Sequence, residues 1–146
     1  MAKPISTCVW YHSSLSLSDI MNYYQRIFAE QFSFGSINKI SDTPSGATEM
    51  CNAELLGNSF MFIKTAEEHQ PINDAISFVI HCKDQQEIDK YWDYFTNEGK
   101  ASQCGWCIDK FGLRWQIIPE NLGALMSKPG SWEVMMKQQK IVISEY

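Results

Sequence analysis

The sequence lacks several features that would assign it to a functional class directly. Its 146 residues include 12 basic and 17 acidic side chains, a net charge of −5, and no segment gathers Lys or Arg into a stripe. Because a nucleic-acid-binding surface concentrates positive charge, we expect no nucleic-acid partner. The uninterrupted apolar runs are only a few residues long, far below the ~20 of a membrane-spanning helix, so we also expect no membrane association.

A secretory signal is also missing from the first residues. The segment MAKPISTCVWYHSS has no apolar core of roughly 7–15 residues. Five cysteines, an odd number, are spread along the chain. Without a secretory signal, reduced thiols are the better interpretation of such a set, and we therefore expect a cytoplasmic protein.

What is present is a domain-sized chain with an internal repeat. Hydrophobic residues make up 45% of the sequence, which is typical of a globular domain. Apolar residues recur at the spacing of one helix face in SDIMNYYQRIFAE and in DQQEIDKYWDYF, which predicts amphipathic helices near 18–30 and 84–97. The two faces superimpose with an offset of 68 residues, which places Ile20 on Ile88.

Short segments rich in β-branched and aromatic residues flank both predicted helices. ISTCVWYHS precedes the first helix and AISFVIHC the second, while FSFGSINKIS, TEMCNAELL and SFMFIK follow the first, and CGWCID and LRWQII the second. Each half therefore reads β-α-β-β-β, which predicts one α+β domain over 1–146 with modules at about 1–70 and 71–146 and a helical tail over about 121–146. Because one such module cannot cover its own sheet, we expect the halves to pair across a shared cavity.

Cys104 and Cys107 have the C-x-x-C spacing of redox dithiols and zinc sites. In thiol oxidoreductases the first cysteine opens a helix that stabilises its thiolate, but the residues after Cys107 predict a turn and a strand. A structural zinc ion needs four ligands, and the best further candidates, His81 and Cys82, are neighbours on a strand and point to opposite faces. We interpret both cysteines as small strand residues without a disulfide, with the redox and zinc sites as alternatives.

Two predicted strands each have a face that mixes small, polar and large side chains, as a cavity lining does. On the first strand this face is Ser6, Cys8, Trp10 and His12, and on the later strand it is Ala75, Ser77, Val79 and His81. Gln116 lies inside an otherwise apolar strand. Because a buried amide needs hydrogen-bond partners, Gln116 meets either another side chain or a ligand, and we favour the ligand. The alternatives are a core role for Trp10 and an exposed or hydrogen-bonded strand end for His81 and His12.

The segments AISFVIHC, YWDYF and QCGWCIDKFGLRWQIIP, taken in order, resemble the vicinal oxygen chelate superfamily of glyoxalases, bleomycin-resistance proteins and dioxygenases. They are most similar to its PhnB-like branch, also labelled 3-demethylubiquinone methyltransferase-like. The resemblance covers nearly the whole chain and is most specific over Gln103–Pro119. It implies a glyoxalase/dioxygenase-like fold of two βαβββ modules whose mixed sheets curl around a cavity, usually in a homodimer.

The resemblance also implies where metal ligands would lie, and the sequence departs from that pattern. The ligand positions of the superfamily fall near Ser6, Met61, Ala75 and Gln116. Met61 and Ala75 are not ligands for a hard divalent ion, so we expect no metal and no other cofactor. A methyltransferase of the doubly wound type needs a glycine-rich cofactor loop, and the eight glycines include no G-x-G.

We therefore expect a small-molecule-binding protein of the vicinal oxygen chelate fold without the usual metal ligands, assembled as a homodimer. The predicted cavity residues are Trp10, Met61, His81, Trp106 and Gln116. The alternative is an enzyme of this superfamily that acts on a small carbonyl or aromatic substrate, although the sequence assigns no catalytic residue. It would use a base or nucleophile, or a displaced divalent-metal site, drawn from His12, His81, Cys104 and Gln116.

Overall fold

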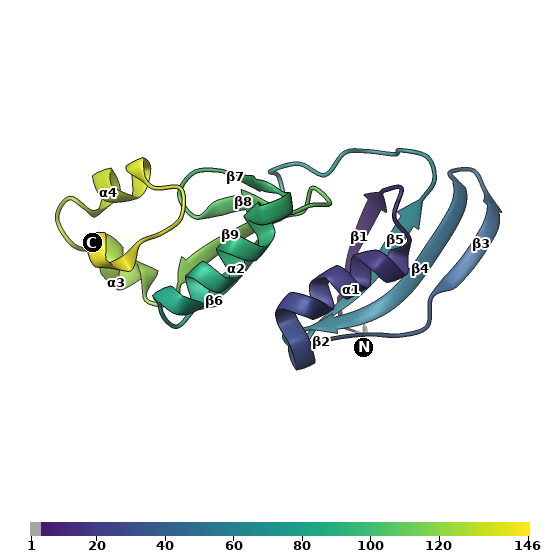
Figure 1. Cartoon of the computed structure of the whole chain (residues 1–146), viewed down its shortest axis with the longest axis horizontal. Helices are drawn as coiled ribbons and strands as arrows, with labels where there is room; N and C mark the ends of the chain where they lie inside the picture. Colours follow the sequence, from purple (N-terminus) through teal and green to yellow (C-terminus); the bar gives the residue numbers. More distant parts are fainter. Residues whose placement is uncertain (1–3) are drawn as a thin grey trace. The chain divides into compact units, whose positions relative to one another are not determined.

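The computed structural model describes residues 4–146 and divides into two compact units, which meet in sequence between Pro71 and Ile72. Each unit consists of a β-sheet with one long helix on one of its faces (Figure 1). The predicted α+β class, with two mixed sheets and few helices, is confirmed. Among the residues that the structure describes, no helix is both long enough and apolar enough to cross a membrane.

Unit 1 contains a five-stranded sheet in the order β1-β5-β4-β2, with β3 paired to β4. Strands β1 and β5 are parallel and the other pairs are antiparallel. The segment FSFGSINKIS, predicted as one strand, is split into two that pair with different parts of β4. The elements are β1 (Thr7–His12), α1 (Leu17–Phe28), a 3-10 turn (Ala29–Gln31), β2 (Phe32–Phe34), β3 (Asn38–Thr43), β4 (Gly46–Leu55) and β5 (Asn58–Thr65).

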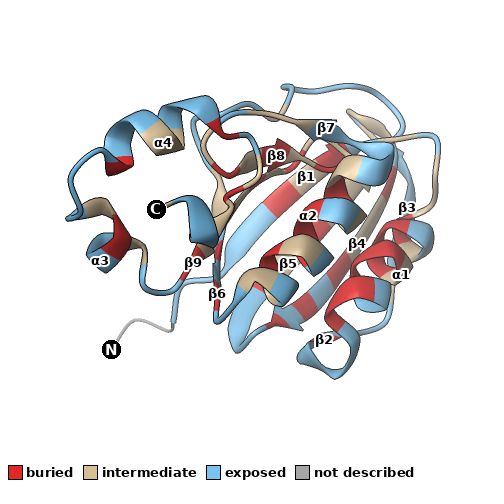
Figure 2. Ribbon diagram, turned by 60° about the vertical axis from the view of Figure 1, so that its left-hand side comes forward, coloured by how far each residue is buried: buried red, intermediate tan, exposed pale blue. Residues whose placement is uncertain are grey.

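Helix α1 begins where Ser16 accepts the backbone N–H of Asp19 at 3.1 Å, a normal N-cap. Its apolar stripe packs on the sheet, and the hydroxyls of Tyr11 and Tyr24 meet at 2.9 Å within this core. Buried residues concentrate on one side of α1 and of α2, and alternate with exposed ones along β4 (Figure 2). The opposite face of the unit 1 sheet, named here the open face of unit 1, carries Cys8, Trp10, Met61 and Ile63.

Unit 2 contains a four-stranded sheet in the order β6-β9-β8-β7, in which β6 and β9 are parallel. The second predicted helix is present, capped by the Asp84 carboxylate, which accepts the Glu87 N–H at 2.9 Å. The predicted helical tail contains two short helices. The elements are β6 (Phe78–Cys82), α2 (Gln85–Glu98), β7 (Lys100–Ala101), β8 (Trp106–Ile108), β9 (Arg114–Pro119), α3 (Leu122–Met126), α4 (Ser131–Lys137) and a 3-10 turn (Ile143–Glu145).

Candidate functional site

The sheet of unit 2 has one face under α2 and one face turned away from it. Along β9 the residues alternate, with Trp115 and Ile117 buried beside the helix and Gln116 half-buried on the other side. Gln116 is the register partner of both Trp106 on β8 and Val79 on β6. These three residues and His81 lie on the sheet face turned away from α2, named here the open face of unit 2. Trp106 and Gln116 are direct neighbours on this face.

The amide of Gln116 is fixed by a second side chain. Its Nε2 donates a hydrogen bond of 2.9 Å to the Ser77 hydroxyl. Within residues 4–146, the amide oxygen accepts no protein hydrogen bond. From the sequence, the partner of Gln116 was either another side chain or a ligand. The Ser77 side chain binds the amide nitrogen, and the amide oxygen stays free to bind a ligand. Ser77 lies on the strand face identified from the sequence, although its contact with Gln116 was not predicted.

A cavity of about 340 Å³ lies beside Trp106. Arg114 forms part of its wall and is held in place, because its Nε donates to Asp74 Oδ1 and its Nη1 to the Ile72 carbonyl, both at 2.8 Å. His81 lies two strands from β8, exposed on β6, and does not line this cavity. The lining residues are Asp74, Ser102, Gln103, Cys104, Trp106, Cys107, Ile108 and Arg114.

Trp10 and Met61 belong to unit 1, where both are half-buried on the open face. The indole N–H of Trp10 donates to Thr65 Oγ1 at 2.8 Å, and its ring stacks on His69 with centroids 4.3 Å apart. One side of the Trp10 ring is therefore occupied by a histidine from the segment after β5. This stack could not be predicted from the sequence, because His69 lies in a polar, proline-bearing connection. The shared cavity of Trp10, Met61 and Gln116 stays a prediction.

The two cysteines of the C-x-x-C spacing have different environments. Cys107 is fully buried on the helix side of β8, and burial, reinforced by the nearby Asp109 carboxylate, raises the pKa of its thiol to about 12. Cys104 lies in the turn before β8 with a φ of 57°, so its expected place on a strand is wrong. All five cysteines are free thiols. A redox dithiol needs a lowered thiol pKa, and Cys107 has the opposite.

The most distinctive motif of the sequence builds the β8–β9 hairpin. The buried carboxylate of Asp109 accepts the backbone N–H groups of Phe111 and Leu113, at 2.8 and 3.0 Å, and the indole N–H of Trp115 at 2.9 Å. Gly112 has a φ of 89° in the same turn, a conformation that favours glycine. The D-K-F-G-x-x-W segment is thus architectural: it sets the hairpin in which Trp106 faces Gln116.

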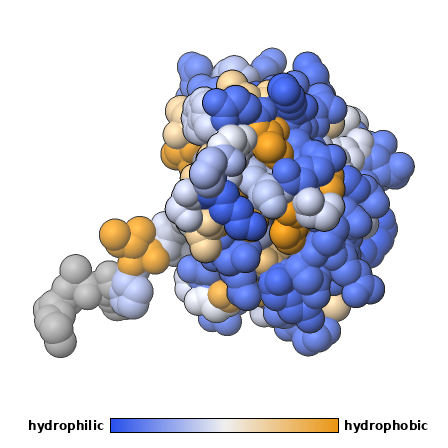
Figure 3. Space-filling view, turned by 90° about the vertical axis from the view of Figure 1, so that its left-hand side faces the viewer, coloured by the Kyte–Doolittle hydropathy of each residue, from blue (hydrophilic) through white to orange (hydrophobic). Residues whose placement is uncertain are grey.

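The C-terminal segment 138–143, named here the strap, holds the turn that precedes Trp106. The N–H groups of Cys104 and Gly105 donate to the carbonyls of Gln138 and Gln139 at 2.9 and 2.8 Å. A side chain at Gly105 would meet the fully buried Ile141, which explains the glycine of C-G-W. The side of unit 2 that carries α3 and α4 is mainly hydrophilic with apolar patches (Figure 3), and Trp132 and Met136 on α4 are exposed.

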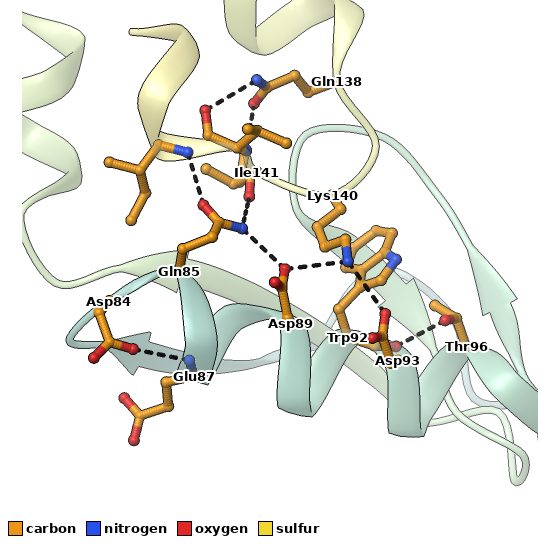
Figure 4. Close-up of polar contacts among 12 residues, drawn as sticks. Asp84, Gln85, Glu87, Asp89, Trp92, Asp93, Thr96, Gln138, Lys140 and Ile141 are labelled. Carbon is orange, nitrogen blue, oxygen red and sulfur yellow. Dashed lines mark hydrogen bonds and ion pairs between the residues drawn. The ribbon is translucent and has the colours of Figure 1, made fainter.

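The strap is anchored on α2 by polar contacts (Figure 4). Gln85 donates from Nε2 to the Ile141 carbonyl at 3.0 Å and accepts the Ile143 N–H at 2.9 Å. The ammonium of Lys140 lies 3.1 Å from Asp89 and 3.2 Å from Asp93. Cys104 is part of the wall of the cavity beside Trp106. The position of this wall therefore depends on the contacts between the strap and α2.

These features define a glyoxalase-like fold, and solved structures with this fold are similar to the chain. A PhnB protein from Bacillus cereus has a TM-score of 0.67 and 23% identity, over 80% of this chain and 99% of its own. The fosfomycin resistance protein FosX from Listeria monocytogenes gives 0.55 and 11%, over 88% and 99%. Glyoxalase I from Leishmania major gives 0.50 and 10%, over 90% and 98%.

Residues 3–118 match the model of the 3-demethylubiquinone-9 3-methyltransferase family, and the chain belongs to this family. A search of curated proteins found no match. The identities to the solved structures are below 25%, so these similarities show the fold and leave ligand and activity to be argued from the residues.

The residues at the superfamily's metal positions do not fit a hard divalent ion. Met61 offers a thioether and Ala75 offers no donor atom, while Ser6 and Gln116 are neutral oxygen ligands. Among residues 4–146, no three His, Cys, Asp or Glu side chains are grouped closely enough to hold a metal. We therefore derive no chemical step through a metal ion.

Proposed function

We propose that this protein binds a small, flat, mostly apolar molecule that carries a carbonyl or hydroxyl group, on the open face of unit 2. One observation carries the proposal: Trp106 and Gln116 are direct register partners, and Ser77 fixes the amide of Gln116 beside the indole. An aromatic surface next to one oriented polar group is the usual composition of a small-molecule site. The adjoining cavity of about 340 Å³ lies within the range of such sites.

The chemistry of this pair defines the ligand class. The ring of a ligand would pack against the indole of Trp106, where aromatic contacts favour offset or edge-on stacking. A ligand hydroxyl would donate to the free Oε1 of Gln116, and a ligand carbonyl would accept the second N–H of its Nε2. Trp10 and Met61, on the open face of unit 1, supply a second aromatic and apolar surface of the same kind.

One observation favours the alternative of an enzyme that acts on a carbonyl or aromatic substrate. Cys104 is half-buried and lines the cavity near Trp106. Covalent catalysis uses a thiol placed next to the carbonyl group of the substrate. Such a thiol needs a base within hydrogen-bond reach. In the described chain its Sγ instead contacts the Met135 carbonyl at 3.5 Å and the Met136 sulfur at 4.0 Å. Binding is therefore the better supported role.

The proposal includes a homodimer in the cytoplasm. Strands β1 and β6 each stand at the end of their own sheet's strand order, so each has one edge without a partner in its unit. Exposed strand edges invite pairing and are normally covered. A second copy of the chain would cover them and enclose the open faces, and the free thiols fit a reducing compartment.

A matched ligand series tests the proposed site. Acetophenone carries a carbonyl, 1-phenylethanol a hydroxyl and ethylbenzene neither, on nearly the same skeleton. We expect the first two to shift the indole N–H signal of Trp106 in heteronuclear NMR spectra, with the signal assigned by its loss in Trp106→Phe. Ethylbenzene should bind more weakly. Equal binding of all three, or shifts that leave Trp106 unaffected, would remove the proposal.

A further inference from the structure

A second cavity, of about 660 Å³, lies in unit 1 and has a different chemical character. It is at the end of the sheet where the β4–β5 hairpin turns. Ser33 on β2, Glu54 on β4 and Ser59 on β5 are successive register partners, so their side chains form one row across three strands. Ser6 extends this row, because it precedes Thr7, whose partner Phe60 follows Ser59. Three hydroxyls and one carboxylate therefore line the same cavity.

The polar side chains of this row are exposed. In the part of the chain that the structure describes, the side chains of Ser6, Ser33, Glu54 and Ser59 make no hydrogen bond or ion pair. Glu49, on the same strand as Glu54, shows the contrast: it accepts the Leu17 N–H at 3.0 Å and lies 3.9 Å from the ammonium groups of two lysines. Glu49 is part of the scaffold, whereas the row is exposed and available.

The charge of the side chains that line this cavity determines which ligand charge it favours. Glu54 is the one charged side chain among the described lining residues, and no Lys, Arg or His accompanies it. Phe34 is half-buried, also lines the cavity and supplies an apolar surface. A carboxylate attracts an ammonium group, and serine hydroxyls can accept the remaining ammonium hydrogens. An aromatic ring next to them favours an apolar body or a cation.

We propose that this cavity of unit 1 binds an organic ammonium ion with an apolar body, held by the Glu54 carboxylate and the flanking serine hydroxyls. The site is independent of the proposed function, because it uses none of the residues named there and selects charge rather than a neutral carbonyl or hydroxyl. Its affinity will be modest: exposed ion pairs contribute about 0.2–1 kcal/mol, which corresponds to a factor of about 1.4 to 5 in affinity.

Three monosubstituted benzenes of similar size test the proposal on the intact chain: benzylammonium, benzyl alcohol and benzoate. We expect benzylammonium to bind most tightly and benzoate least, with shifts at the backbone amides of Ser33, Gly35 and Asn52. Glu54→Gln should weaken benzylammonium binding two- to fivefold and leave benzyl alcohol unchanged. Added salt should weaken binding to the unsubstituted chain and have little effect on Glu54→Gln.

The matched control is Glu30→Gln, which removes an exposed carboxylate outside the cavity. Both substitutions are at exposed positions, and circular dichroism will verify that the variants fold. The proposal is overturned if benzylammonium binds no more tightly than benzyl alcohol, or if Glu30→Gln weakens it as much as Glu54→Gln. Because Glu54→Gln leaves Trp106 and Gln116 in place, the acetophenone response of unit 2 should persist, and the two proposals fail separately.

Discussion

The indole N–H of Trp115 donates a 2.9 Å hydrogen bond to the carboxylate of Asp109 in the interior of unit 2. The same carboxylate accepts two backbone N–H groups of the β8–β9 turn. One buried side chain thus fixes both the turn and the tryptophan that stacks on Phe95, with centroids 4.7 Å apart. The hairpin that presents Trp106 to Gln116 depends on this network.

Asp109→Ala should therefore destabilise the protein by about 3 kcal/mol, because three donors lose their acceptor, two of them buried, and a buried donor costs roughly 1–3 kcal/mol when unsatisfied. Urea unfolding followed by tryptophan fluorescence measures the effect. The control Asp42→Ala, at an exposed position of β3, should change stability by no more than about 0.5 kcal/mol. Equal stability of the two variants would show that the network contributes nothing.

Gln116→Leu should fold normally, since leucine has a similar volume and the side chain is only half-buried. It should lose acetophenone affinity by roughly 1–3 kcal/mol, the cost of a lost buried hydrogen bond. Ser77→Ala is the informative companion: it keeps the amide but removes the 2.9 Å contact that orients it, so it should weaken binding less. If Gln116→Leu unfolds, the amide is structural; if it folds and binds as well as the unsubstituted chain, the amide does not contact the ligand.

The thiols should fall into two classes of reactivity. Cys8 is exposed and Cys104 half-buried, whereas Cys51, Cys82 and Cys107 are buried. We expect the thiol reagent dithiobis(nitrobenzoate) to modify two thiols in the native protein and all five after denaturation without reductant. Cys104→Ser should remove one of the two native-state reactions. Fewer than five thiols in the denatured, non-reduced protein would reveal a disulfide and revive the redox interpretation.

Stability should decrease at alkaline pH because of the buried thiols. Burial, the largest cause, raises the pKa of Cys51 to about 11 and those of Cys82 and Cys107 to about 12, from an ordinary value of 9.0. Above pH 9 the unfolded chain therefore loses these protons first, and the free energy of unfolding falls as pH rises toward 11–12.

The slope from each thiol is about 1.4 kcal/mol per pH unit. Urea unfolding at several pH values between 8 and 10.5 measures the combined slope. Cys107→Ala is less stable at every pH because it leaves a cavity, but its slope above pH 9 should be shallower by one thiol's contribution. An identical slope in both proteins would rule out Cys107 as a source of the pH dependence.

If the proposed homodimer forms, the protein should sediment at micromolar concentration as a species of twice 16.8 kDa. Its stability should depend on protein concentration, since association favours the folded state. Replacement of Val79, which is 41% exposed on the end strand β6, by lysine should favour the monomer without unfolding unit 2. Sedimentation of the unsubstituted chain as a monomer of 16.8 kDa would contradict the prediction.

The repetitive features of the fold were predictable from the sequence, because they follow from side-chain periodicity. The apolar faces around Ile20 and Ile88 gave two helices that the structure places at Leu17–Phe28 and Gln85–Glu98. Trp106 and Gln116 were both predicted as cavity residues, but their pairing across the β8–β9 hairpin was not. The Ser77 contact depends on strand pairing across 39 positions of the chain, which local sequence does not encode.

The strand position predicted for Cys104 was wrong, because contacts with residues far along the chain set its conformation. The segment around Cys104 has the composition of a strand. Cys104 nevertheless lies in a turn with a left-handed backbone conformation, because its N–H and that of Gly105 donate to the carbonyls of Gln138 and Gln139. The stack of Trp10 on His69 has the same origin: a segment without periodicity folds back onto a strand. Contacts of this kind require the assembled fold.

The strap has a consequence for the order in which the two units mature during synthesis. Hydrogen bonds of the unit 1 sheet join residues within the first 71 positions, so that unit can fold while the rest of the chain is still being made, since domains fold as units from the N-terminus. In unit 2 the turn at Cys104 and Gly105 gains its acceptors when Gln138 and Gln139 leave the ribosome. A nascent chain halted at residue 118, where the family match ends, would carry a finished first sheet and an unfinished ligand cavity.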